Sequence, residues 1–238
     1  MVGLGPEDSN FALELTYNYG IDHYRQGNDL LYFALAMPEA VPRAHALGYR
    51  VVYAAGVPTI IGPDNYHYRI VEPMAGVAER FVAVGLRSSD LAASRSYWCG
   101  VLGMQERSPA PGLESTGGEA SLAVGWSNAQ VQFALGRKPI RTCTQVASAR
   151  CVLSCRTQVA LHFVQSGDEV GQRVRVEHAE NAGRIANVCR AVEPFYHAAR
   201  ASGQGGILNA PLTLPTPGKA DVRVTILTDP DGVRGQNS

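Results

Sequence analysis

The stretch FALELTYNYG, at residues 11–20, decides the fold. Its side chains alternate, so that an extended chain carries apolar groups on one face and mainly polar groups on the other. The first face holds Phe11, Leu13, Leu15, Tyr17 and Tyr19, and the second holds Ala12, Glu14, Thr16 and Asn18. A period of two predicts a β-strand that packs its apolar face on a core. Glu14 and Asn18 then point to the opposite side, which in a curved sheet can be a cavity.

The residues after this strand complete a longer pattern. Gly20 ends the strand, and Tyr24 and then Gly27-Asn28 follow. The pattern resembles glyoxalase I and its vicinal-oxygen-chelate superfamily. That resemblance implies an α+β fold of paired βαβββ units, and it implies that the carboxylate at the position of Glu14 is a metal ligand. The alternation alone predicts a solvated strand residue at Glu14.

Two domains of such units are predicted, at 1–72 and 80–238, with a linker at 73–79. In the first domain we expect strands at 11–19, 30–36, 49–54 and 66–71, and a helix at 38–46. In the second we expect strands at 81–86, 121–126, 130–135, 173–176, 184–188 and 222–227, and helices at 90–102 and 194–203. Ser88 or Ser89 is the expected cap of the first of these helices.

Three segments depart from a complete set of units. Residues 137–172 show no sustained period, which predicts an irregular insertion, with a lid or partner-binding loop as the alternative. The resemblance places a strand and a helix before Met1, and a last strand after the turn at 229–232. Residues 233–238 are too polar and too short to supply that strand, so N-terminal and C-terminal strands are expected to be missing. Open sheet edges favour a homo- or hetero-oligomer.

The composition argues against two classes of partner. Twenty-one basic and 21 acidic side chains leave no net charge, so no long-range field favours nucleic acid or an anionic membrane. The apolar run at 30–37 is far too short to span a membrane. The first residues contain no basic segment leading into an apolar one, so neither a signal peptide nor a transit peptide is predicted. We expect a cytoplasmic protein, and the resemblance allows association with mitochondria.

The cysteines predict free thiols. Five of them, at 99, 143, 151, 155 and 189, leave one unpaired and show no Cys-x-x-Cys spacing, which fits a reducing compartment better than a disulfide framework. The group Cys143, Cys151, Cys155 and His162 has enough ligands for zinc. Its spacing matches no zinc-finger pattern, so the thiol interpretation is favoured.

The resemblance also fixes where a metal site would lie. The family takes its four ligands from the first and last strands of two paired units: His or Gln, then the Glu matched by Glu14, then His, then Glu. The first would precede Met1, the third falls on Tyr32 and the fourth on Arg69. Tyrosine is a poor substitute for an imidazole, and a guanidinium cannot ligate. In the second pair the positions fall on Ala83, Ala134 and Arg184.

These substitutions predict a degenerate metal site with no cofactor, in a non-catalytic module that binds a ligand or a partner. The ligand expected is small and anionic or derived from glutathione, and its candidate contacts are Asn18, Tyr32, His67, Arg69 and Arg184. The competing hypothesis is a lactoylglutathione lyase, a carbon–sulfur lyase that acts on the hemithioacetal of methylglyoxal and glutathione. It would need zinc or nickel, Glu14 as the catalytic carboxylate, and a replacement ligand such as His67.

Overall fold

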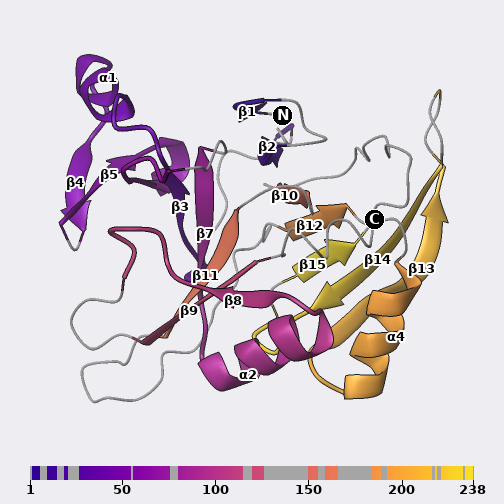
Figure 1. The fold of residues 1–238 in the computed structure, drawn as a ribbon. Helices are drawn as coiled ribbons and strands as arrows, with labels where there is room; N and C mark the ends of the chain where they lie inside the picture. Colours follow the sequence, from indigo (N-terminus) through magenta and orange to yellow (C-terminus); the bar gives the residue numbers. More distant parts are fainter. Residues whose placement is uncertain are drawn as a thin grey trace.

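The computed structural model describes residues 2–5, 10–14, 19–20, 27–54, 56–75, 80–114, 120–125, 150–154, 159–165, 184–188, 192–215, 218, 221–232 and 234–237. For residues 2, 14, 64, 150–154, 184–188 and 234–237 it describes the backbone alone. The described strands form one sheet of eight strands and one of seven (Figure 1).

The eight-stranded sheet consists of two βαβββ units. The first unit is β3 (Leu30–Leu35), α1 (Ala40–Ala46), β4 (Val51–Ala54), β5 (Val57–Ile61) and β6 (His67–Ile70), with a 3₁₀ turn, η1 (Pro63–Asn65), before β6. The second is β7 (Phe81–Arg87), α2 (Leu91–Arg95) continued by the π-helix η2 (Ser96–Val101), β8 (Gln105–Arg107), β9 (Ala120–Gly125) and β11 (Ala160–Gln165). The strand order is β4-β5-β6-β3-β7-β11-β9-β8. The predicted fold class is therefore confirmed.

The two units join through their first strands. β3 and β7 pair antiparallel, while each first strand pairs in parallel with the last strand of its own unit, β6 or β11. The β3–β7 pair thus joins a strand before the linker predicted at 73–79 to a strand after it. The division into domains at that linker stays a prediction, but the continuous sheet is formed by the second and third units of the chain.

The seven-stranded sheet collects segments from both ends of the chain. Its order is β1 (Val2–Gly3), β2 (Ala12–Glu14), β10 (Arg150–Ser154), β12 (Arg184–Val188), β15 (Arg234–Asn237), β14 (Val222–Thr228) and β13 (Gly206–Leu214). The helix α4 (Glu193–Ser202) packs on β13 and β14. Gly203, with φ of +66°, ends it at the predicted place.

Three predictions about these segments were wrong. The expected irregular stretch at 137–172 contains β10 and β11, and β11 is paired on both sides. The expected absence of a last strand is contradicted by β15, which pairs with β12 and β14, because strand pairing satisfies backbone groups whatever the side chains are. Asp90, not Ser88 or Ser89, caps α2 by accepting bonds from the N–H groups of Ala92 and Ala93. The strands predicted at 130–135 and 173–176 lie outside the described residues.

A common core ties the two sheets to the helices. Phe11, directly before β2, and Leu227 of β14 belong to the same buried cluster as Val84 and Phe163 of the eight-stranded sheet, together with Trp98 of η2. Each such side chain contributes about 1.5–3 kcal/mol by leaving water. Trp98 also donates its indole N–H to Asp229 at 3.3 Å, which anchors the turn after β14 to η2. None of the described helices has the length and apolar character of a membrane span.

Candidate functional site

Three residues lie in one row across the middle of the eight-stranded sheet. Tyr32 on β3 is directly opposite Gly85 on β7, and Gly85 is directly opposite His162 on β11. Residues paired in this way direct their side chains to the same face. Gly85 has no side chain, and a Cβ placed there would come within 2.5 Å of the Tyr32 ring. Because Gly85 has no side chain, the Tyr32 ring can lie over Gly85 and reach His162.

The tyrosine hydroxyl and the imidazole form a buried hydrogen bond. The Tyr32 hydroxyl contacts Nδ1 of His162, and each residue is only 2% exposed. Burial, and after it the Arg69 charge, lower the pKa of His162 to about 4, while Glu114 acts in the opposite direction. The imidazole is thus neutral at pH 7, and we assign Tyr32 as the donor and Nδ1 as the acceptor.

This assignment places the ring proton of His162 on Nε2. Nε2 is buried and has no hydrogen-bond partner among the described residues. A buried donor without an acceptor costs about 1–3 kcal/mol. His162 therefore carries one buried N–H, on Nε2, that donates a hydrogen bond to no described residue.

Arg69 brings a fixed positive charge to the same place. It lies on β6, opposite Ala34 on β3 and Thr59 on β5. Its guanidinium carbon lies 4.0 Å from the centroid of the Tyr32 ring, which is a cation–π contact. Tyr32 is thus held by a glycine beneath its ring, a histidine at its hydroxyl and an arginine over its face.

The register relates the two units by an approximate two-fold axis. Tyr32 lies opposite Gly85 and Ala34 opposite Ala83, so the axis exchanges Tyr32 with Ala83 and Ala34 with Gly85. Arg69 is the neighbour of Ala34, and His162 is the neighbour of Gly85. Arg69 and His162 are therefore equivalent residues of the two units.

The first and last strands of the two units of this sheet thus place Tyr32, Arg69, Ala83 and His162 at equivalent positions. The resemblance predicted a site that joins Tyr32 and Arg69 with Glu14, but the backbone of Glu14 lies on β2 of the other sheet. Of the four equivalent residues, only the histidine is an ordinary metal ligand, and its Nδ1 is already bonded to Tyr32. A guanidinium beside it would repel a divalent ion. Among the described side chains, no group of three or more His, Cys, Asp or Glu residues could hold a metal ion. The described residues of this face therefore do not fit a metal ion.

The structure brings together some predicted site residues and separates others. Tyr32 and Arg69, two of the predicted site residues, are in contact. Glu14 has its backbone on β2 of the other sheet, and Arg184 has its backbone on β12, but the side chains of both lie outside the described part. Asn18 is not among the described residues. His67, opposite Ile61, is half-buried two positions before Arg69. Their roles stay predictions.

Sequence reasoning missed His162 as a site residue. It assigned the last strand of the third unit to 130–135 and the ligand position to Ala134, whereas the structure uses β11. The signal was a single histidine inside the apolar run ALHFV at 160–164. The alternative zinc group of His162 with Cys143, Cys151 and Cys155 cannot be compared with the structure, since those cysteine side chains lie outside its described part.

Comparison with known proteins shows which family this chain resembles in sequence. A family model described as "Glyoxalase domain-containing protein 4-like, C-terminal domain" matches residues 142–234. The match covers most of residues 137–172, the stretch predicted to be an irregular insertion, so the matched domain includes this stretch. Mouse glyoxalase domain-containing protein 4 is 31% identical over 234 residues, covering 98% of this chain and 65% of the relative. Glyoxalase 1 of Caenorhabditis briggsae is 30% identical over 233 residues, covering 97% and 66%.

Two further similarities concern lyases. Lactoylglutathione lyase of Oryza sativa subsp. japonica is 34% identical over 116 residues, which is 44% of this chain and 40% of the relative. The crystal structure of glyoxalase I from Zea mays superposes with a TM-score of 0.70 at 23% identity, covering 99% of this chain and 76% of that one. At this identity the superposition establishes the fold. The chain spans just under two thirds of the length of the mouse and nematode relatives.

Proposed function

Because this chain belongs to the vicinal-oxygen-chelate superfamily, near glyoxalase domain-containing protein 4 and glyoxalase I, we propose that it is a metal-free member that binds a small anionic ligand. It does not catalyse the lactoylglutathione lyase reaction. The proposal rests on one observation: the Tyr32 side chain, held by His162 and Arg69, occupies the centre of the face on which the family places its metal.

The physical argument concerns the charge of the reaction. A glyoxalase-type lyase stabilises a developing oxyanion with a divalent ion, and losing one stabilising donor costs a hundredfold or more in rate, on the order of 10²–10³. At this site the positive charge belongs to Arg69, which is fixed on an aromatic ring. It offers a charge for binding, but it leaves no coordination position for a substrate oxygen.

The same charge defines the ligand. Arg69 and the unused Nε2–H of His162 are both donors, and they lie on one face around Tyr32. A guanidinium and a neutral imidazole N–H together suit an acceptor such as a carboxylate or phosphate oxygen. A glutathione-derived acid belongs to this class.

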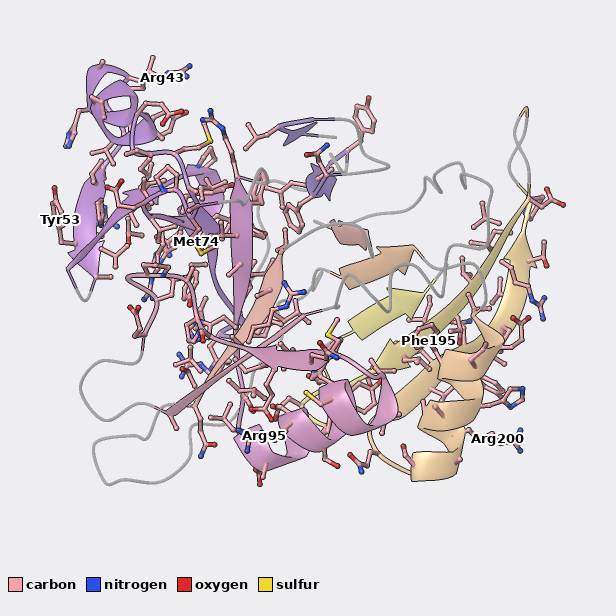
Figure 2. The ribbon with its side chains drawn as sticks, in the orientation of Figure 1. Arg43, Tyr53, Met74, Arg95, Phe195 and Arg200 are labelled. Carbon is pink, nitrogen blue, oxygen red and sulfur yellow. The ribbon has the colours of Figure 1, made fainter. Side chains whose placement is uncertain are left out.

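Association through sheet edges is the second part of the proposal. Tyr53 of the edge strand β4 projects away from the sheet (Figure 2) and is 69% exposed, and Val52 beside it is exposed as well. The edge strand β13 exposes Ile207 and Leu208. Unpaired backbone beside exposed apolar side chains favours pairing with another chain. Light scattering on purified protein should give a mass above that of a monomer. A monomer at all concentrations would reject association through the sheet edges.

The lyase remains the alternative, because His162 is neutral and could ligate zinc if Tyr32 moved away. Thioester formation from methylglyoxal and glutathione should be followed with added zinc or nickel, with Glu14→Gln as the matched variant. We expect no metal-stimulated turnover. Stimulated turnover that the Glu14 variant lacks would establish the lyase and reject the metal-free proposal.

Ligand binding needs a separate experiment. Calorimetric titration with glutathione should show binding that Arg69→Gln weakens about tenfold or more, since a hydrogen bond to a charged group contributes about 1.5–3 kcal/mol. Arg43→Gln, an exposed arginine of α1, is the control and should leave the affinity unchanged. If the two variants lower the glutathione affinity equally, the affinity depends on the net charge of the protein and not on a contact with Arg69.

A further inference from the structure

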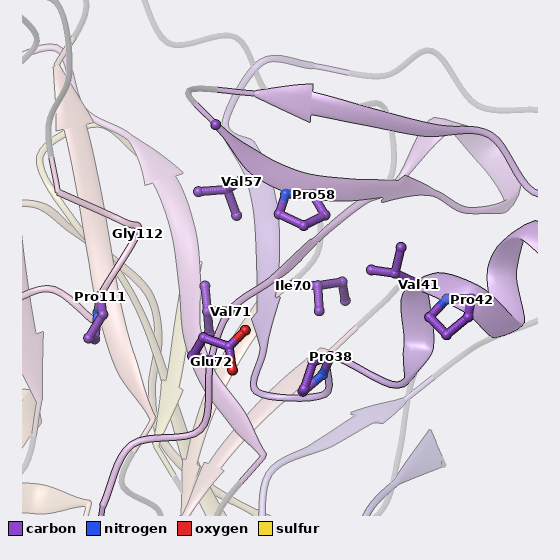
Figure 3. A pocket seen from close by; sticks show the side chains of 11 residues that line it. Pro38, Val41, Pro42, Val57, Pro58, Ile70, Val71, Glu72, Pro111 and Gly112 are labelled. Atoms are coloured by element: carbon purple, nitrogen blue, oxygen red, sulfur yellow. The ribbon is translucent and has the colours of Figure 1, made fainter.

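A pocket of about 530 Å³ is lined by residues of the first unit of the eight-stranded sheet and of the turn at 111–112. Figure 3 shows its side chains converging from the start of α1, from β5, from the end of β6 and from the turn at 111–112. Its volume falls in the range of about 300–1,000 Å³ that small-molecule sites occupy. Neither the Tyr32 nor the His162 side chain lines it.

The walls are apolar and preformed. Four of the eleven lining residues are proline: Pro38, Pro42, Pro58 and Pro111. Proline has no N–H and a fixed φ, so these walls offer few donors and little freedom to collapse. The floor is made by Val57 and Val71, which are 6% and 5% exposed and belong to the buried cluster behind the pocket.

One turn closes the pocket from the side. Gly112 has φ of +84°, and its N–H donates to the Glu114 carboxylate at 2.7 Å. A Cβ at Gly112 would lie 3.3 Å from a methyl group of Val57, so the turn sits directly against the floor. Leu113, 2% exposed, anchors the turn in the same buried cluster.

The only charged side chain among the lining residues is Glu72. It is exposed, and it forms no ion pair with another described residue. Arg80, a described cation of the following segment, is instead paired with Glu39. The pocket therefore combines an apolar, donor-poor interior with one carboxylate that no described cation neutralises.

We propose that this pocket binds a small organic amine, with its apolar body against Val57, Val71 and the prolines and its ammonium group beside Glu72. The charge is opposite to that expected for the ligand at Arg69 and His162, and the lining residues differ. The two sites share no lining residue, although Val57 and Val71 belong to the same buried cluster as Tyr32. This proposal does not depend on the proposed function.

Three probes of equal size and different charge test the proposal on the full chain: cyclohexylmethylamine, cyclohexylmethanol and cyclohexanecarboxylate. Ligand-observed NMR should give the affinity order amine, alcohol, carboxylate. Glu72→Gln should reduce the amine affinity about two- to fivefold, to that of the alcohol, since exposed charge pairs are weak. It should leave alcohol binding unchanged. Glu106→Gln, which removes an exposed carboxylate outside the pocket, is the control and should change nothing.

A second variant tests the cavity itself. Val41 is a half-buried lining residue of α1, so Val41→Phe fills the pocket from a position with room to adjust. It should abolish binding of all three probes while the thermal melt stays cooperative. Carboxylate binding as tight as amine binding, an amine preference that survives Glu72→Gln, or probe binding unchanged by Val41→Phe in a cooperatively melting protein would overturn the proposal.

Discussion

The two units of the eight-stranded sheet share one architecture and differ at equivalent positions of their shared face. In the first unit, Tyr32 and Arg69 supply a bulky ring and a fixed charge. In the second, the equivalent residues are Ala83 and His162, with Gly85 leaving room between the strands. The bulky half fills the space that the small half leaves. The difference shows how a symmetric pair of units can place an asymmetric, packed polar cluster at its centre.

The largest expected effect tests the imidazole of the second unit. Burial lowers the pKa of His162 to about 4 from an unfolded value near 6.5, so between these values the unfolded chain binds a proton that the folded chain does not. Stability should therefore fall as pH falls from 6.5 to 4, by up to about 3 kcal/mol. Urea unfolding from pH 7 to pH 4 measures this.

The matched variant for that series is His162→Gln, which keeps a polar side chain without the titration. Its stability should depend less on pH over the same window. If the two proteins lose stability in parallel, other groups carry the pH dependence and His162 is not held neutral by the fold.

The next effect tests the fit between the two halves. Gly85→Ala places a Cβ against the Tyr32 ring and should cost about 1–3 kcal/mol by overpacking. In a Tyr32→Ala background the same change should cost almost nothing. Additive losses in the double variant, measured by urea unfolding, would mean that Gly85 serves another purpose.

A smaller effect concerns the hydroxyl alone. Tyr32→Phe keeps the ring over Gly85 but leaves Nδ1 of His162 without its donor, which should cost about 1–2 kcal/mol. Thermal melts report the change, and Tyr53→Phe on the exposed edge strand is the control that should be silent. If Tyr32→Phe loses no more thermal stability than Tyr53→Phe, the hydrogen bond between Tyr32 and His162 does not stabilise the fold.

The smallest effect concerns the charge of the first unit. Arg69→Met removes the cation–π contact at a cost of about 0.5–1 kcal/mol. It also removes a positive charge that lowers the pKa of His162, so that pKa should rise. NMR titration of the imidazole measures the direction, and a fall or no change would show that Arg69 does not act on His162.

The sequence predicted local elements better than partners. The apolar run at 30–36, the alternation at 66–71, and the proline and glycine bounding 194–203 identify β3, β6 and α4 because these signals are local. Pairing of β3 with β7 is not local, so the contact of Tyr32 with His162 could not be read from either strand. β11 is buried on both faces and shows no alternation, and β15 is polar, so both escaped a search for period two.

The sequence points to the site residues of one unit, whereas the residue from the other unit depends on non-local strand pairing. Tyr32 and Arg69 follow from the resemblance, which fixes positions within one unit. The contribution of the other unit depends on which units join, and the sequence paired them differently. The absence of a metal stays a prediction, made from residues that cannot ligate. How the space is filled, with the Tyr32 ring over Gly85, could be seen only from the strand register.

The central claim is that Tyr32, His162 and Arg69 form a metal-free cluster, and a zinc titration followed by the ring ¹⁵N signals of His162 tests it most directly. We predict Nδ1 as an unprotonated acceptor and Nε2 as a protonated nitrogen at pH 7, with neither signal moved by one equivalent of zinc. A stoichiometric shift of either nitrogen, absent in His162→Gln, would contradict the account and place a metal ion between the two units.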